Sequence, residues 1–175
     1  MTEDTAVAHF WEVARVAGKV SRLEVFMGRA PLDTVPPPAW SFGADQLEAD
    51  RLLAAVLEGR KTAATSPYRE YEGTEENLPH VGDLSIVLDG AGQPRALIRT
   101  TAVAVVPFAD VDPEHARADG VETIDEWSEL HERVFTARAG QNGRVFTTDD
   151  PVVLERFALV YPKARRVRTA VPEPA

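Results

Sequence analysis

The stretch "GRKTAATS", residues 59–66, places two basic side chains directly before a run of small residues rich in hydroxyl groups. A lysine that is partly desolvated in a cleft can act as a base, or it can stay charged and hold an oxyanion or a phosphate. A neighbouring hydroxyl group can orient a water molecule for the same reaction. The pattern makes Lys61 the leading candidate for chemistry, with Arg60, Thr62, Thr65 and Ser66 beside it.

Lys61 also has an explanation that involves no chemistry. Apolar residues on one helical face predict a helix over residues 45–58, and Gly59 is a typical helix stop. The carboxyl end of a helix carries partial negative charge, so Arg60 and Lys61 are favourable there on electrostatic grounds alone. The spacing leaves both explanations open. If Lys61 is catalytic, we expect Lys61→Ala to abolish turnover and to leave the fold intact, because a helix-end lysine contributes at most ~1 kcal/mol to stability.

Candidate binding residues follow the lysine segment. Tyr68 and Tyr71 could stack on an unpaired base, and Arg69, Arg99 and Arg144 are candidates for contacts with phosphate. Each also has an ordinary structural explanation, since loop tyrosines usually cover the edge of a core and lone strand arginines are usually solvated.

The cysteine and histidine residues that most often bind transition metals are absent or scattered in this sequence. There is no cysteine, and the four histidines (His9, His80, His115 and His131) form no HxxxH or HxH pair. We therefore predict no cofactor and no metal site, while a dependence on Mg²⁺ bound by carboxylates stays open. His131 falls on the apolar stripe of a predicted helix, which is typical of a satisfied core histidine. His115 lies on a polar helix and is expected to be exposed.

Composition and charge narrow the classes of protein. A chain of 175 residues suits one domain with appendages. The formal net charge of −9 argues against broad non-specific binding to nucleic acid, because the overall field repels phosphate. No apolar run approaches the ~20 residues needed to span a bilayer, and the first residues are acidic where a secretory signal has lysines. We expect a cytoplasmic protein that does not bind membranes.

The elements that must position Lys61 can be read from periodicity and turn residues. Helical stripes predict a helix over 6–27, loosened near Gly18, and two short helices within 112–137. Between the first helix and residue 45 lies a connector with three consecutive prolines. Near alternation predicts a hairpin of strands 83–89 and 95–108, with a tip at "GAGQP", and a last strand over 151–162. This order favours an α+β domain built round a small antiparallel sheet or barrel.

Seven segments occur in an order that resembles the ASCH domain, a branch of the PUA-like superfamily. They are "WSFG", "GRKTA", "VGDLSIVLDG" with "RALIRTTAVAVVPF", "ARADG", "EWSELHERVF" and "PVVLERFALVYP". The resemblance covers residues 40–162 and implies a small antiparallel β-barrel flanked by helices, with a cleft lined by the lysine of the G-x-K-T motif. Residues 1–39 resemble the helix and Pro-rich connector that lead into the longer bacterial members, packing on the domain. Residues 163–175 form a basic tail outside the resemblance, and we expect it to be disordered.

The resemblance also implies a function directed at RNA or modified nucleosides. Small relatives hydrolyse the amide of N4-acetylcytidine with a lysine, a threonine three residues later and an acidic residue after the hairpin, and other members are described as ribonucleases. Carried over, the lysine is Lys61 and the acidic residue is Asp119, where a glutamate is usual. The threonine position falls on Ala64, which has no hydroxyl group, unless Thr65 takes the role by a shift of one residue.

Three hypotheses follow. The first is a hydrolase acting on RNA or a modified nucleoside, with the catalytic candidates Lys61, Thr62, Thr65 and Asp119. The second is a module that binds RNA or a nucleotide without chemistry, with the binding candidates Arg60, Ser66, Tyr68, Arg69, Arg99 and Arg144. The third is a protein-interaction domain that uses the N-terminal helix and the acidic surface. The sequence predicts no particular oligomeric state.

Overall fold

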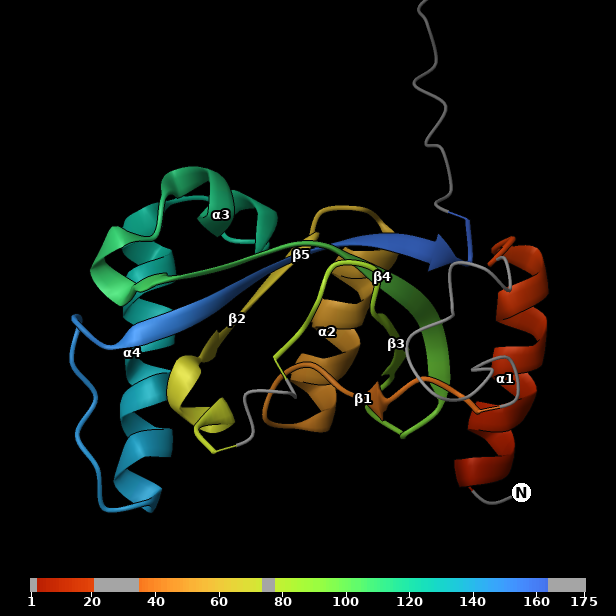
Figure 1. The fold of residues 1–175 in the computed structure, drawn as a ribbon, viewed down its shortest axis with the longest axis horizontal. Coiled ribbons are helices and arrows are strands. Elements are labelled where there is room, and N and C mark those ends of the chain that lie inside the picture. Colours follow the sequence, from red (N-terminus) through yellow and green to blue (C-terminus); the bar gives the residue numbers. More distant parts are fainter. Residues whose placement is uncertain (1–2, 21–34, 74–77, 164–175) are drawn as a thin grey trace, which may run out of the picture.

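The computed structural model describes residues 3–20, 35–73 and 78–163. Its helices are α1 (Glu3–Ala17), α2 (Gln46–Leu57), α3 (Pro113–Ala118) and α4 (Ile124–Gln141), with short 3-10 turns at Tyr68–Tyr71 (η1) and Phe108–Asp110 (η3) (Figure 1). Its strands are β1 (Ala39–Trp40), β2 (Ala63–Pro67), β3 (Leu84–Leu88), β4 (Pro94–Pro107) and β5 (Pro151–Tyr161).

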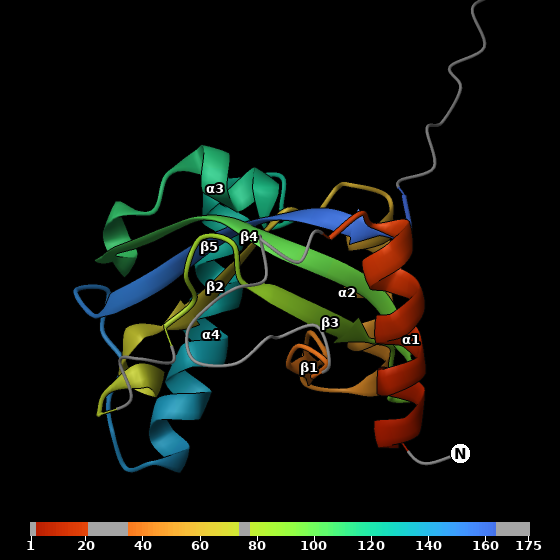
Figure 2. The same cartoon turned by 45° about the vertical axis from the view of Figure 1, so that its right-hand side comes forward.

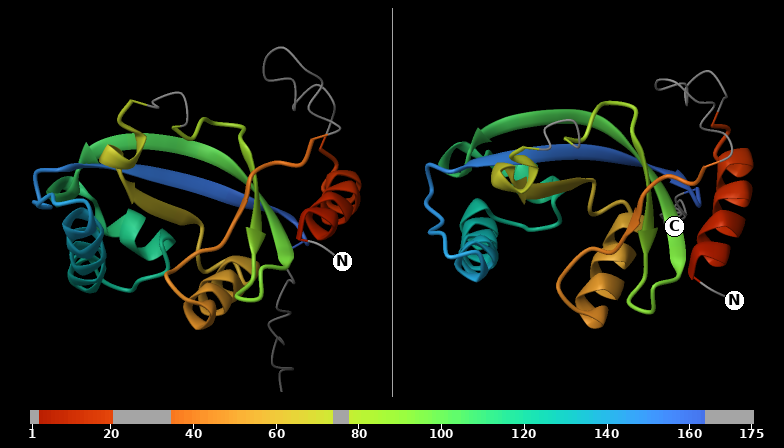
Figure 3. Two further views of the ribbon diagram at one scale, coloured as in Figure 1. Left: turned by 90° about the horizontal axis from the view of Figure 1, so that it is seen from below. Right: turned by 60° about the horizontal axis from the view of Figure 1, so that its bottom comes forward.

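The strands form one curved sheet in the order β1-β3-β4-β5-β2. Long antiparallel β4 and β5 run side by side from the Leu97–Tyr161 pair to the Pro107–Pro151 pair. Figure 3 shows the sheet arching over α2, α3 and α4. The predicted α+β class, with a barrel-like sheet flanked by helices, is confirmed. Within the described residues the sheet does not close, because β1 and β2 remain its two edges.

One pairing differs from the purely antiparallel sheet that was predicted. β1, from the end of the connector, pairs parallel with β3 through Ala39–Ile86 and Trp40–Val87. Parallel neighbours need a long crossover connection, and here that crossover contains α2 and β2. The predicted surface connector therefore ends as an edge strand of the sheet.

Helices cover the two ends of the sheet and its hollow face. Figure 2 shows α1 and α4 at opposite ends of the sheet. Three groups of buried residues fill the space between helices and sheet, one around Leu53 and Val56 of α2, one around Trp127 and Phe135 of α4, and one around Trp11 of α1. Among the residues that the structure describes, no helix is long and apolar enough to cross a bilayer.

Helix α2 follows its sequence signals closely. The Asp45 side chain accepts a hydrogen bond from the Glu48 backbone N–H at 2.8 Å, and the Glu48 carboxylate accepts one from the Ala44 N–H at 2.9 Å. This reciprocal arrangement satisfies free N–H groups of the first turn. Gly59 ends the helix with a φ of +75°, a conformation that glycine adopts without steric cost. The predicted helix over 45–58 is confirmed, so the chain leaves α2 immediately before Lys61.

Two other elements differ in length from their predictions. Helix α1 ends at Ala17, and most of the remainder of the helix predicted over 6–27 lies outside the described residues. The second of the two short helices predicted within 112–137 is instead the 18-residue helix α4. It begins after the N-cap Thr123 and extends past residue 137 to Gln141. The basic tail lies outside the described residues except for Lys163. The proposed division of the chain at residues 39 and 162 stays a prediction.

Helix α1 is anchored to the sheet by Trp11, whose residue is 2% exposed. Together with Ala14 it packs in a cluster that includes Ile86 of β3 and Leu97 of β4. We expect Trp11→Ala to lower the free energy of unfolding by about 3–5 kcal/mol, because it removes a large buried ring and leaves a cavity. Val16→Ala on the same helix is the control, since Val16 is 70% exposed. Urea denaturation of both variants measures the difference, and equal small effects would contradict the packing of α1 on the sheet.

Candidate functional site

The Lys61 side chain is buried and points to a distant part of the chain. It is 5% exposed, its Nζ pairs with Asp119 Oδ1, and it donates a further hydrogen bond to the Asp119 backbone oxygen at 3.1 Å. Nζ also lies 4.9 Å from the centre of the Phe42 ring. The helix-end explanation therefore does not account for Lys61, because its charge is engaged by a carboxylate 58 residues away in sequence.

Backbone contacts bring these two residues together. The Thr62 N–H donates to the Ala118 carbonyl at 2.7 Å, which ties the start of β2 to the end of α3. Gly120 turns the chain directly after Asp119 with a φ of +93°, and a Cβ built there would lie 3.6 Å from Lys61 Cβ. The ion pair thus sits where the segment after α2 meets the end of α3.

The Asp119 carboxylate is surrounded by donors. Besides the Lys61 contact at Oδ1, its Oδ2 accepts hydrogen bonds from Thr65 Oγ1 at 3.1 Å and Trp127 Nε1 at 2.9 Å. His131 Nε2 lies 3.2 Å from the same oxygen. Burial by itself raises the pKa of Asp119, but the charge of Lys61 and the bond from His131 outweigh it and hold the pKa well below the usual range. A carboxylate held ionised in this way is better suited to orienting Lys61 than to carrying protons.

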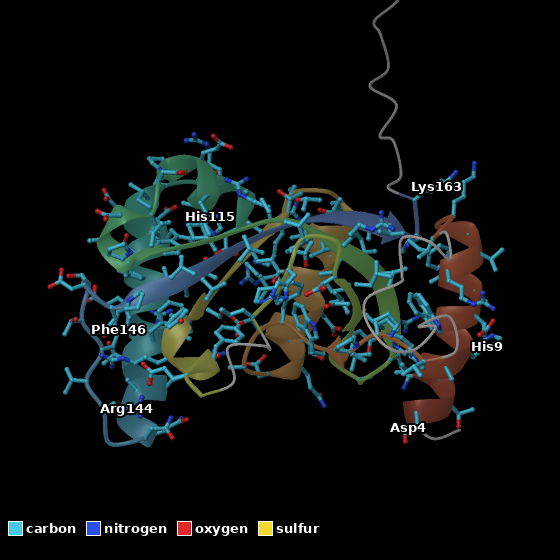
Figure 4. All side chains as sticks on the ribbon, viewed as in Figure 1. Asp4, His9, His115, Arg144, Phe146 and Lys163 are labelled. Atoms are coloured by element: carbon cyan, nitrogen blue, oxygen red, sulfur yellow. The ribbon has the colours of Figure 1, made fainter. Side chains whose placement is uncertain are left out.

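His115 is buried, which corrects the expectation that it is exposed. It is 2% exposed and belongs to the short helix α3, where Figure 4 labels it. The Asp112 side chain caps α3 by accepting a hydrogen bond from the His115 N–H, and His115 and Ala116 are the buried residues of this helix. Burial lowers the pKa of His115. A neutral imidazole with its proton on Nε2 donates to Thr65 Oγ1 at 2.9 Å, and Thr65 in turn donates to Asp119.

His131 is half-buried and belongs to the same cluster. Its ring stacks on Trp127 with centroids 4.3 Å apart, and its Nδ1 lies 3.0 Å from the Trp127 carbonyl oxygen. Sequence reasoning treated His131 as a core residue, and it missed its contact with Asp119. The available signal was the spacing of four residues between Trp127 and His131, which puts both on one helical face.

Four residues of this cluster border a cleft of about 1440 Å³ beneath the curved sheet, namely Lys61, Thr65, Asp119 and His131. Of the predicted catalytic residues, Lys61, Thr65 and Asp119 line it, and Thr62 does not. Aromatic side chains from other elements share the wall, namely Trp40, Phe42 and Tyr71. Ala64 lines it as well, without a hydroxyl group to offer. Across the described part of the chain, no group of three His, Cys, Asp or Glu side chains is arranged to hold a metal ion.

Of the predicted binding residues, Ser66 and Tyr71 line this cleft, and Ser66 Oγ lies 2.9 Å from Tyr71 Oη. Arg60 lies at the surface and pairs with Glu58. Tyr68 is the first residue of the 3-10 turn η1 and is half-buried. Arg99 is half-buried on β4, where it pairs across the sheet with Leu84 of β3.

The other two arginines border a second cavity of about 440 Å³ between η1 and the end of α4. Arg69 pairs with Asp150 at 2.5 Å, and Arg144, labelled in Figure 4, pairs with Glu72 at 3.2 Å. Both guanidinium groups therefore already have carboxylate partners.

The similarity of this chain to known proteins identifies its family. Residues 38–161 match the family model of the ASCH domain. A crystal structure of a protein from Enterococcus faecalis V583 is similar, with 32% identity, a TM-score of 0.74 and coverage of 90% of this chain and 91% of that one. An ASCH domain from Lactobacillus crispatus JV V101 is 26% identical with a TM-score of 0.70, over 86% of this chain and 96% of that one. No curated protein matches the sequence. The chain belongs to the ASCH domain family.

The buried ion pair predicts a large stability effect, in contrast to the ~1 kcal/mol that sequence reasoning allows. We expect Lys61→Ala to lower the free energy of unfolding by about 3–5 kcal/mol, because it leaves the Asp119 charge buried without its cation. Arg60→Ala is the matched control, since its exposed pair with Glu58 contributes about 1 kcal/mol or less. Chemical denaturation of both variants measures this. A Lys61→Ala protein as stable as Arg60→Ala would show that the ion pair does not support the fold.

Proposed function

We propose that this chain is a hydrolase that acts on RNA or a modified nucleoside, and that Lys61 stabilises the negative charge that develops in the reaction. The observation that carries the proposal is the Lys61–Asp119 ion pair on the wall of the cleft. An oriented cation in a site of restricted solvent access is far more effective than the same cation in water. The bond from Nζ to the Asp119 backbone oxygen restrains the position of that cation.

Two reactions fit such a cation. In hydrolysis of an N4-acyl cytidine, water adds to the acyl carbon and the carbonyl oxygen becomes an oxyanion beside Lys61. In cleavage of an RNA phosphodiester, the charge instead builds on the phosphate oxygens. In both cases Asp119 acts by orienting Lys61.

Aromatic side chains on the cleft wall support recognition of a base. Trp40 and Phe42 meet edge to face with ring centroids 4.6 Å apart, and Phe42 also lies beside the Lys61 ammonium group. Tyr71 lines the same cleft. A base that is splayed out from a single strand, or free in a nucleoside, binds proteins through stacking of this kind. RNA as a ligand is also what membership of the ASCH family suggests.

Two observations favour a second function, a module that binds RNA or a nucleotide without chemistry. Ala64 supplies no hydroxyl group at the position where the catalytic relatives have a threonine. In addition, Asp119, the carboxylate that pairs with Lys61, has its oxygens engaged by four side chains.

Mass spectrometry separates the two functions. We expect wild-type protein to deacetylate or cleave a short single-stranded RNA that contains N4-acetylcytidine. Lys61→Ala should be at least ~100-fold slower, the usual loss when one oxyanion donor is removed. Lys61→Arg keeps a cation for Asp119 and so guards against simple unfolding, yet it should also be slow because the planar guanidinium group moves the charge.

Arg95→Ala is the control, because Arg95 pairs with Asp89 near the tip of the hairpin. Circular dichroism verifies that each variant is folded. If wild-type protein binds the RNA but leaves its mass unchanged, with and without Mg²⁺, the binding module is correct and the hydrolase is not. If it neither binds nor converts the RNA, both functions are wrong for that substrate.

A further inference from the structure

A second carboxylate, Glu155, lines the same cleft. It lies on β5, which runs beside β2 (Figure 1), and the register pairs it with Ala64. Ala64 is three residues from Lys61. Glu155 therefore belongs to the strand that flanks the lysine segment, on the opposite side from α3 and Asp119.

The surroundings of Glu155 differ from those of Asp119. Its Oε1 accepts one hydrogen bond, from Thr100 Oγ1 at 2.5 Å, and among the described residues it forms no ion pair with a cation. Burial, and to a lesser degree the charge of Asp83, raise its pKa. The charge of Glu155 in turn contributes, after burial, to a raised pKa of Tyr71, and both residues line the cleft.

Two of the carboxylates that line this cleft thus lie in opposite environments. Asp119 has four donors, one of which is the buried Lys61 cation, and its pKa is lowered. Among the described residues Glu155 has one donor, Thr100, and its pKa is raised. Active sites often contain two carboxylates whose pKa values are shifted in opposite directions by their surroundings. One carboxylate then stays ionised, and the other exchanges protons near the working pH.

We propose that Glu155 is the proton carrier of this site. The proposal rests on the hydrolase function proposed above, and it gives proton transfer to Glu155, whereas sequence reasoning listed Asp119 as the acidic residue among the catalytic candidates. In amide hydrolysis, water adds its oxygen to the acyl carbon, its proton passes to the Glu155 carboxylate, and the carbonyl electron pair moves onto oxygen beside Lys61. The C–N bond then breaks as that electron pair returns, and the leaving nitrogen takes the proton from Glu155. The products are a carboxylic acid and a free amine.

The same group can serve an RNA substrate without an added reactant. Glu155 then takes the proton of the 2′-hydroxyl group, the 2′-oxygen bonds to phosphorus, and the bond from phosphorus to the 5′-oxygen breaks. The 5′-oxygen receives the proton from Glu155, which yields a 2′,3′-cyclic phosphate and a 5′-hydroxyl end.

Glu155→Gln tests the proposal, because glutamine keeps the shape and the acceptor for Thr100 but cannot exchange protons. On the RNA containing N4-acetylcytidine, we expect kcat to fall at least ~100-fold with KM little changed. The acidic limb of the pH profile of kcat should disappear. Glu155→Asp should retain that limb at a reduced rate, since a shorter carboxylate still titrates.

Glu70→Gln is the control, since its carboxylate also lines the cleft but pairs with the exposed Arg138. It should keep both the rate and the pH profile. If wild-type protein converts the RNA and Glu155→Gln keeps its rate, or loses rate with the acidic limb in place, Glu155 is not the proton carrier while the hydrolase stands. If wild-type protein converts nothing, the hydrolase itself fails and this role fails with it. Thermal melts of every variant exclude loss of fold as the cause.

Discussion

The buried ion pair between Lys61 and Asp119 is the constraint on which the local structure depends. Two charges removed from water destabilise a protein unless they are paired and their remaining hydrogen-bonding capacity is met. Here the requirement is met with the help of two further elements, because Thr65 of β2 and Trp127 and His131 of α4 complete the shell around Asp119. Helix α2 must end where it does, and α3 must end against β2, for the two charges to meet. The same contacts leave the ammonium group on the wall of a large cleft.

The curved sheet gives that cleft its form and its second carboxylate. β5 contributes Glu155 on the flank of β2 away from Asp119, and β1 brings Trp40 to the rim. Since the two carboxylates lie in different surroundings, their pKa values move in opposite directions. The site is therefore built from a fixed charge and a group that can titrate, and not from two equivalent acids.

Local signals were sufficient for much of this fold. The cap and stop residues of α2, the alternation of β3, β4 and β5, and the position of Lys61 can all be predicted from neighbours in sequence. The short strand β2 was missed, because "AATSP" shows no alternation of apolar and polar residues. The burial of His115 was missed for a related reason. The segment around α3 is largely polar, so no apolar stripe indicates that His115 faces the core.

The connections that define the site are long-range, and this is why sequence reasoning found its members but not their roles. Lys61 and Asp119 are 58 residues apart, and Thr100 and Glu155 are 55 apart. At such separations, no periodic pattern in the sequence indicates that the two residues of either pair are in contact. The resemblance to the ASCH domain supplied Asp119, but its role in holding Lys61 depends on donors that only the folded chain assembles around it.

The most direct test of this account is a carbon-13 NMR titration of the Asp119 carboxyl group, with Asp119→Asn identifying its resonance. The account predicts that the chemical shift keeps its ionised value down to the lowest pH at which the protein stays folded. A titration midpoint at or above ~3.9, the value of an unperturbed aspartate, would contradict it. That result would mean that Lys61 does not hold Asp119 ionised, and the division of roles between Asp119 and Glu155 would lose its basis.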